Sequence, residues 1–171
     1  MLDTNFMHAV VLVVQHTASG AHGFVLNQRL GPSTADLLGE GSALARAALP
    51  VRAGGPVGLD SLQFLHRIPD VIPRGMSLGG GLFLGGDLDG LPEDLDGERL
   101  GEGIRVFVGY SGWGPGQLEG ELAAGGWLTV HTQSAIVFEA EDREPTWRRV
   151  LRSLGGAGPE LSQQPPDPSW N

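Results

Sequence analysis

The residues with the clearest chemical potential lie in one stretch, 106–130, which reads VFVGYSGWGPGQLEGELAAGGWLTV. At 109–113 the letters GYSGW differ by one position from the nucleophile-elbow pattern G-x-S-x-G, in which a strand delivers a reactive serine to the start of a helix. Trp113 stands where the pattern has a glycine, and the only His downstream of Ser111 is His131. A serine hydrolase is therefore an alternative interpretation of this stretch and not the favoured one.

The favoured interpretation of the same stretch is a binding corner. Residues 104–108 form a β-type run, a glycine-rich turn follows, and a helix is predicted from Pro115 to Gly125-Gly126. A second strand is predicted at Trp127–Val130. Backbone N–H groups point outward at the start of a helix, so a strand-to-helix corner suits a ligand. The glycines of this turn have no Walker-type Lys beside them, and we interpret them as structural.

Two further polar side chains follow predicted strands. Asn27 comes after the apolar run Phe24–Leu26, and Asp87 comes after Leu82–Leu84. Each is also explained as a turn or cap residue. We predict one ligand site made of these two side chains and three residues of the corner: Asn27, Asp87, Tyr110, Trp113 and Gln117.

No catalytic residue, cofactor or metal site is predicted. The chain has no Cys, which excludes thiolate chemistry and disulfides. Its five His are dispersed along the sequence. His16 and His22 could face each other across a hairpin and hold a metal ion, which we keep as an alternative.

Charge and apolar content limit the partners. Eleven Arg, with no Lys, stand against twenty acids, for a formal charge of −9. Such a balance argues against nucleic acid as a partner, because duplex phosphates require a basic face. The longest apolar run, Ala9–Val14, is far shorter than the roughly 20 residues that span a bilayer. We therefore expect a cytoplasmic protein that does not enter the membrane.

Periodicity and turn residues predict the elements. Ala9–Val14 predicts a strand apolar on both faces, forming a hairpin with Phe24–Leu26. Ser33 and Asp36 predict a capping box at the start of a helix. The apolar stripe Trp147, Val150, Leu151 and Leu154 predicts an amphipathic helix near the end of the chain.

The domain organisation follows from these elements. We predict one domain over residues 1–155 and a Pro-rich disordered tail over 156–171 that adds nothing to the fold. The acidic segment 87–102 is predicted to be a solvated excursion. Alternation of strands and helices from about residue 60 predicts the α/β class. The expected architecture is a compact single domain with a mixed β-sheet flanked by helices, a layered α/β sandwich.

Four motifs together resemble one known family. They are HGFVLNQRL at 22–30, GGPV at 54–57, LFLGGDLD at 82–89 and GYSGWGPGQLEGELAAGGWLTV at 109–130. Their order and spacing resemble the YqgE/AlgH family from about Phe6 to Leu154. The resemblance implies a compact bacterial α/β domain with a mixed sheet, and one branch carries the label of transcriptional regulator. It supplies no catalytic residue and no cofactor.

The start of the chain departs from that family. Relatives carry a longer stretch before the strand at Ala9, and residues 1–6 resemble only its last part. We therefore expect the Val-rich edge of this strand to be exposed and the chain to self-associate through it.

The functional prediction is a non-enzymatic binding or regulatory protein that acts through a protein partner or a small ligand. An alternative from another class is a hydrolase or transferase using Asp87 or Ser111. DNA-binding regulation is a third reading, which rests on the family label alone.

Overall fold

A computed structural model describes residues 6–39, 41–89, 91, 97–131, 133–140, 143–156 and 158–163. The strands are β1 Val11–Thr17, β2 Gly20–Val25, β3 Arg29–Ser33, β4 Pro50–Ala53, β5 Val57–His66, β6 Met76–Gly79, β7 Leu82–Leu84 and β8 Ile104–Trp113. The helices are α1 Thr34–Leu37, α2 Ala43–Ala47, α3 Gly97–Gly103, α4 Gln117–Ala123, α5 Ser134–Phe138, α6 Arg143–Ser153 and α7 Gly158–Leu161.

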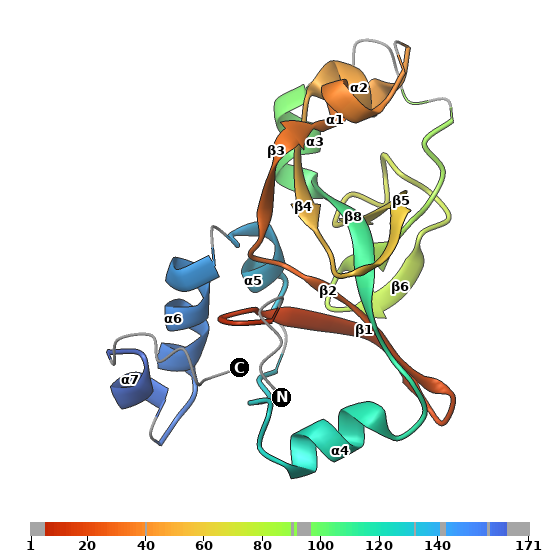
Figure 1. Cartoon of the computed structure of the whole chain (residues 1–171). Helices are drawn as coiled ribbons and strands as arrows, with labels where there is room; N and C mark the ends of the chain where they lie inside the picture. Colours follow the sequence, from red (N-terminus) through yellow and green to blue (C-terminus); the bar gives the residue numbers. More distant parts are fainter. Residues whose placement is uncertain are drawn as a thin grey trace.

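One sheet joins all eight strands, with β8 at its centre. The main path is β1-β2-β8-β5-β7-β6, and β4 lies between β3 and β8. Only the β4–β8 pairing is parallel among the pairings described, so the sheet is mixed, as expected, and mostly antiparallel. In Figure 1, α1–α3 gather at one end of the molecule, α4 lies at the other end, and α5–α7 lie beside β1 and β2.

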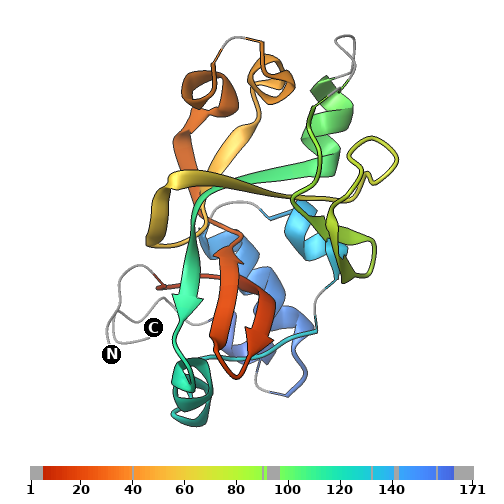
Figure 2. The same cartoon turned by 90° about the vertical axis from the view of Figure 1, so that its right-hand side faces the viewer.

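The sheet curls toward a barrel, which differs from the layered α/β sandwich that we expected. The two strands at the ends of the path, β1 and β6, line the same cleft. The strong twist and curl can be followed in Figure 2. Glycine-rich bends explain the difference, since β8 changes direction at Gly109, where φ is 65°.

Gly54 is the point where three strands are tied together. Its N–H donates to Val108 O (2.9 Å), and its carbonyl accepts the N–H of Val25 (2.9 Å). The same carbonyl accepts the hydroxyl of Ser111 (3.0 Å). β8 can therefore pair with β4 through residues 106–108 and then with β2 through residues 111–113, on one continuous strand.

Apolar side chains fill three clusters. The first lies inside the curled sheet and includes Leu12, Phe24, Leu82 and Phe107, with α5 contributing Phe138. The second lies under α2 and α3, around Val51, Ile72 and Leu100. The third is small and joins α4 to the outer face of β1 and β2 through Ala21, Trp113 and Leu118.

Several predicted elements are confirmed. β1 and β2 form the predicted hairpin, with Val11 opposite Val25. The capping box before α1 is present, and the Ser33 N–H donates to Asp36 Oδ2 (2.8 Å). This N–H and the Ser33 hydroxyl lower the pKa of the Asp36 carboxyl. Helix α6 buries Val150 and Leu151 of the predicted stripe.

Other predicted elements are wrong. Trp127–Val130 is not a strand, and Leu128 is 63% exposed. β8 continues through the glycines to Trp113, so the corner lies later than expected, and α4 begins at Gln117 with Gly116 as its N-cap. A β-type composition does not by itself make a strand, because packing and burial in the tertiary structure override the local preference.

The remaining differences concern the outer segments. β1 is an edge strand whose Val13 is 41% exposed, so it is not buried on both faces. Residues 97–102 of the acidic segment lie in α3, which buries Leu100. The described part of the predicted tail is folded: α7 follows α6, and Arg148 Nη1 donates to the carbonyl of Ser162.

Gly54→Ala tests the tie between the strands. A Cβ at Gly54 would lie 2.3 Å from the carbonyl oxygen of Gly109, closer than atoms can approach. We expect a loss of about 1–3 kcal/mol in the free energy of unfolding, the usual cost of overpacking. Gly31→Ala is the matched control, because a Cβ at Gly31 meets no atom within 4 Å. Urea unfolding of both variants is the measurement, and equal stability would show that the strands separate there without cost.

Candidate functional site

An apolar cavity of about 700 Å³ lies against the outer face of β1. Its walls come from the segment before β1, from β1 itself, from α4 and the segment 125–130, and from α6. Three indoles face it, those of Trp113, Trp127 and Trp147. A volume of this size is typical of a small-molecule pocket.

Asn27 holds in place the segment before β1, which forms one wall of the cavity. Its side-chain oxygen accepts the N–H of Val10 (2.8 Å), and its amide donates to the carbonyl of His8 (2.8 Å). Asn27 is fully buried and does not itself line the cavity. It therefore acts on the site indirectly, by holding the segment that contributes Phe6 and His8 to the wall.

On the α4 side the wall is a cluster of aromatic side chains, and one carboxylate, that of Glu121, accepts hydrogen bonds from two of them. Glu121 Oε2 accepts the indole N–H of Trp113 (3.0 Å) and that of Trp127 (2.7 Å). Phe6 packs between the two indoles, with ring centroids 6.2 and 5.5 Å away. Gln117 Nε2 donates to the other oxygen of Glu121 (3.0 Å), so Gln117 supports this wall from the outside.

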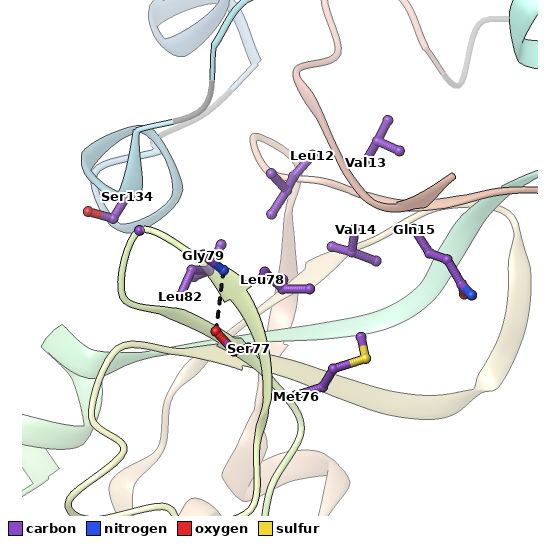
Figure 3. Close-up of a pocket in the computed structure, with 11 residues that line it drawn as sticks. Leu12, Val13, Val14, Gln15, Met76, Ser77, Leu78, Gly79, Leu82 and Ser134 are labelled. Atoms are coloured by element: carbon purple, nitrogen blue, oxygen red, sulfur yellow. Dashed lines mark hydrogen bonds between the residues drawn. The ribbon is translucent and has the colours of Figure 1, made fainter. Parts of the chain in front are cut away.

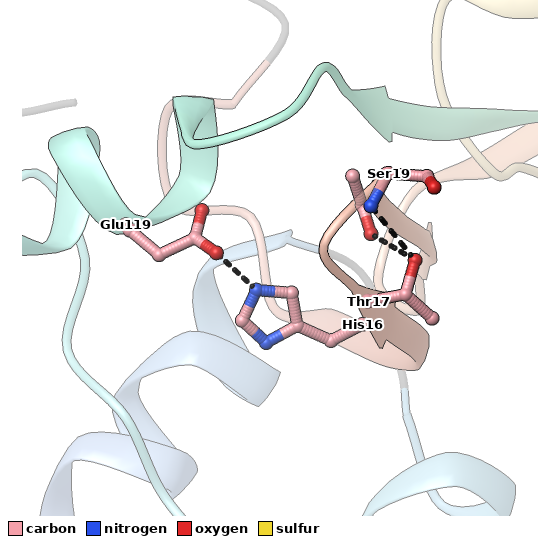
Figure 4. A network of polar contacts seen from close by, with 5 residues as sticks. His16, Thr17, Ser19 and Glu119 are labelled. Atoms are coloured by element: carbon pink, nitrogen blue, oxygen red, sulfur yellow. Dashed lines mark hydrogen bonds and ion pairs between the residues drawn. The ribbon is translucent and has the colours of Figure 1, made fainter.

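A polar contact involves His16, one of the residues that line the cavity. His16 of β1 lies 2.8 Å from Glu119 of α4, Nε2 to Oε1, and joins the hairpin to that helix (Figure 4). A hydrogen bond from its own backbone and one from His16 lower the pKa of the Glu119 carboxyl. Both side chains are exposed, so the pair contributes little stability.

Two of the predicted site residues lie elsewhere. The Tyr110 ring packs on His22, with centroids 4.5 Å apart, against the cluster inside the sheet. Asp87 forms an ion pair with Arg74 and caps the N–H of Asp89 (2.8 Å). Neither residue lines the cavity. Of the five predicted residues, the structure brings together Trp113 and Gln117, which both bind Glu121. Asn27 lies behind the opposite wall and does not line the cavity.

The residues behind the alternative interpretations, a serine hydrolase and a metal site, have structural explanations. Ser111 is fully buried, and its hydroxyl donates to the carbonyl of Gly54. His16 and His22 lie in adjacent register positions, opposite Ala21 and Gln15, so they point to opposite faces of the hairpin. Within the described residues, no group of three His, Asp or Glu is placed to hold a metal ion.

Sequence reasoning missed most of the cavity. The apolar stripe predicts an amphipathic helix, yet its Trp147, Leu151 and Leu154 also face the cavity. The sequence predicts Leu128 and Val130 in a strand, whereas both line the cavity. A usable signal was present in the density of indoles, because three of the four Trp surround one space.

One buried histidine lies away from this cavity. His66 has no exposed surface, its ring stacks on Phe83 with centroids 5.3 Å apart, and Gly75 leaves room for its Nε2. Burial lowers the pKa of His66, and a backbone contact with Gly85 opposes this in part. This environment therefore favours the neutral form of the imidazole.

The fold and the cavity define a class of protein with a curled, mostly antiparallel sheet and an apolar pocket on its outer face. The AlgH-like family model matches residues 1–158. UPF0301 proteins of Streptomyces avermitilis and Chlorobaculum tepidum are 38% and 34% identical, each over the whole chain and 90% of its relative. The chain therefore belongs to the AlgH-like family, as its motifs indicated.

Solved structures agree with this assignment. The solution structure of the AlgH protein from Pseudomonas aeruginosa matches with a TM-score of 0.70 at 29% identity, covering 96% of this chain and 88% of that one. The crystal structure of protein DIP2367 from Corynebacterium diphtheriae matches with a TM-score of 0.72 at 22% identity, over 96% and 86%, and supports the fold. None of the helices in the described residues is long and apolar enough to cross a membrane.

Trp113→Ala tests whether the indole stabilises the cavity wall. Trp113 is 7% exposed, so we expect a loss of about 3–5 kcal/mol in the free energy of unfolding. Trp113→Phe keeps the ring packing and removes the N–H that Glu121 accepts, so we expect about 1–2 kcal/mol. Urea unfolding measures both. An unchanged midpoint for the Ala variant would mean that the indole does not stabilise this wall.

The lowered pKa of His66 predicts a pH dependence of stability. The unfolded chain takes up a proton near pH 6.5, whereas the folded chain resists it until lower pH. Folding stability is therefore lost as the pH falls below about 6.5, and His66→Gln should reduce this loss. Thermal melts between about pH 7.5 and pH 5 are the measurement. His131→Gln, at an exposed position, is the control, and an unchanged pH profile in His66→Gln would contradict the prediction.

Proposed function

We propose that this protein is a non-enzymatic binding protein whose apolar cavity holds a small apolar ligand. The observation that carries the proposal is the cavity of about 700 Å³ with walls made almost wholly of aliphatic and aromatic side chains. Pockets for small molecules have this size and composition, with a few polar groups that orient the ligand. Here His8, His16 and Thr129 are the polar residues of the lining.

The ligand class follows from the lining and the charge. The surface has an excess of acids, with a formal charge of −9, so an anionic ligand would be repelled. The interior offers indole faces and branched aliphatic side chains. An uncharged molecule with an aromatic ring or a short alkyl chain fits both conditions. A regulatory role in the cytoplasm would then consist of sensing such a molecule and passing the change to a partner.

The competing functions have less support. The buried hydroxyl of Ser111 and the paired carboxylate of Asp87 favour structural roles over a hydrolase or transferase. DNA-binding regulation conflicts with the negative charge. Retention on duplex DNA at about 50 mM salt, lost on raising the salt, would favour that function over ours.

Binding of N-phenyl-1-naphthylamine, an uncharged fluorescent probe, tests the proposal. We expect a Kd of about 1–10 µM for the native chain. Leu154→Trp should fill part of the cavity from α6 and weaken binding at least about tenfold, or about 1.4 kcal/mol. Leu59→Trp is the matched control, because Leu59 is 65% exposed and lies outside the cavity. Equal loss in both variants, or no binding to the native chain, would contradict the proposal.

A further inference from the structure

Four arginines gather on one face of the sheet, and we call them the arginine cluster. They are Arg29 at the start of β3, Arg52 in β4, Arg105 in β8 and Arg67, which directly follows β5. Strand register brings three of them together. Arg29 lies opposite Arg52, and Arg52 lies opposite Phe107 of β8. Arg105 is two residues from Phe107, and both register partners and residues two apart share a face of a sheet.

The end of α5 packs against this face and positions the side chains. Arg52 Nη2 donates to the carbonyl of Ala140 (3.0 Å), and Arg105 Nη2 donates to that of Phe138. The guanidinium carbons of Arg67 and Arg105 lie 4.6 and 5.2 Å from the centre of the Phe138 ring. Carbonyl groups at the end of a helix and the face of an aromatic ring both attract cations. The end of α5 therefore accounts for the positions of three of the four arginines.

The described surroundings do not neutralise the cluster. Four other arginines each form an ion pair with a carboxylate: Arg74, Arg99, Arg148 and Arg149. Within the described residues, no such pair forms at Arg29, Arg67 or Arg105. Burial, followed by the charges of Arg67 and Arg29, lowers the pKa of Arg105 to about 10. Its guanidinium therefore stays protonated at neutral pH, close enough to the other two to be repelled by them. An anion at the cluster would relieve this repulsion.

Acidic residues of the chain itself are too few to neutralise the cluster. Glu139 follows α5 but pairs with Arg149, Nη1 to Oε2, at 3.5 Å. Glu141 and Asp142 come next after Ala140 in the sequence and lie outside the described residues. Even with both carboxylates at the cluster, its four arginines would retain an excess of two positive charges. The cluster therefore favours a further anion, and a dianion matches the excess.

Other occupants fit less well. Phe6 packs between Trp113 and Trp127 on the α4 side, away from α5, so a longer start of the kind that relatives carry would begin far from the cluster (Figures 1 and 2). A nucleic-acid duplex requires contacts along many phosphates, which one cluster on a chain of formal charge −9 does not offer. An acidic peptide would bring carboxylates of one charge each to a site whose excess is two.

We infer that the arginine cluster binds a phosphate group, contacted by Arg29 and Arg67 and supported by the fixed charge of Arg105. The side chains of Arg29 and Arg67 are exposed, so their N–H groups can reach a ligand. A planar guanidinium donates two parallel hydrogen bonds to phosphate oxygens. Arg105 instead donates to the carbonyls of Gly101 and Ile104 (2.6 and 2.7 Å), so it contributes charge rather than contacts.

The negative charge of the whole chain does not prevent this binding. Charges farther away than about 8 Å are largely screened at physiological salt, so the local excess decides whether an anion binds. Neither the apolar cavity nor the cleft between β1 and β6 (Figure 3) is lined by an arginine. The phosphate site is therefore separate from both, and it does not require a ligand in the cavity.

Calorimetric titration of the whole chain with two probes, inorganic phosphate and glycerol 2-phosphate, tests the site. We expect a Kd below about 1 mM for at least one probe at about 50 mM NaCl. The probe that binds more tightly identifies the source, a free phosphate ion or a phosphate ester. Acetate, with a single charge, should bind at least about tenfold more weakly. No binding below about 1 mM, or equal binding of acetate, would overturn the inference.

Two variants with a matched control show where the probe binds. Arg67→Gln and Arg29→Gln each remove one exposed guanidinium and should weaken binding at least about tenfold. Arg152→Gln changes the net charge by the same amount at an exposed position in the last turn of α6, and it should leave the Kd within about twofold. Circular dichroism checks that all three variants fold. An equal loss in all three would show that the probe responds to net charge alone and overturn the site.

A double variant, Glu141→Gln with Asp142→Asn, tests the chain's own carboxylates. If these filled the cluster, the native chain would fail to bind phosphate and the double variant would bind it below about 1 mM. That result would assign the cluster to the chain's own acids and overturn the inference. Binding by the native chain that changes less than about threefold in the double variant supports it. None of these readouts depends on the naphthylamine probe, so failure at the arginine cluster and failure at the cavity are distinguishable.

Discussion

The close approach of the backbone at Gly54 is the constraint on which the fold depends. β8 must pair with β5 along one side while it passes from β4 to β2 on the other. That exchange leaves peptide groups that need partners. Gly54 accepts the N–H of Val25 and donates to the carbonyl of Val108, and its carbonyl also accepts the side-chain hydroxyl of Ser111. A side chain at this position would separate the strands. The curl of the sheet, and with it the open barrel, follows from this crossing.

The same crossing explains why the family motifs identify the fold but give no information about an activity. The GGPV motif supplies Gly54, the GYSGW motif supplies Ser111 and the bend at Gly109, and the HGFVLN motif supplies Val25. Three separated motifs meet because each provides one part of a single backbone arrangement. A residue pattern of this kind identifies a fold with high specificity. It therefore supports membership of the AlgH-like family and leaves the function to the surfaces that the fold creates.

Local patterns predicted the elements whose causes are local. The β1–β2 hairpin, the Ser33 capping box and the apolar stripe of α6 depend on residues close in sequence, and all three are present. Pairing across long separations was not predictable in the same way, since Trp127–Val130 has a β-type composition but pairs with none of the described strands. The cavity combines segments more than 100 residues apart, which explains why Trp113 could be proposed while the α6 residues could not.

β1 forms one wall of the apolar cavity, and few contacts determine its position. Val11, Leu12 and Val13 border the cavity. Among the described strands β1 pairs with β2 alone, and Asn27 holds the segment before it by accepting the N–H of Val10. A molecule in the cavity would therefore contact a strand that is paired on one edge only. If the molecule binds one position of β1 better than another, it shifts the strand toward that position, and the position of β1 sets the affinity in return.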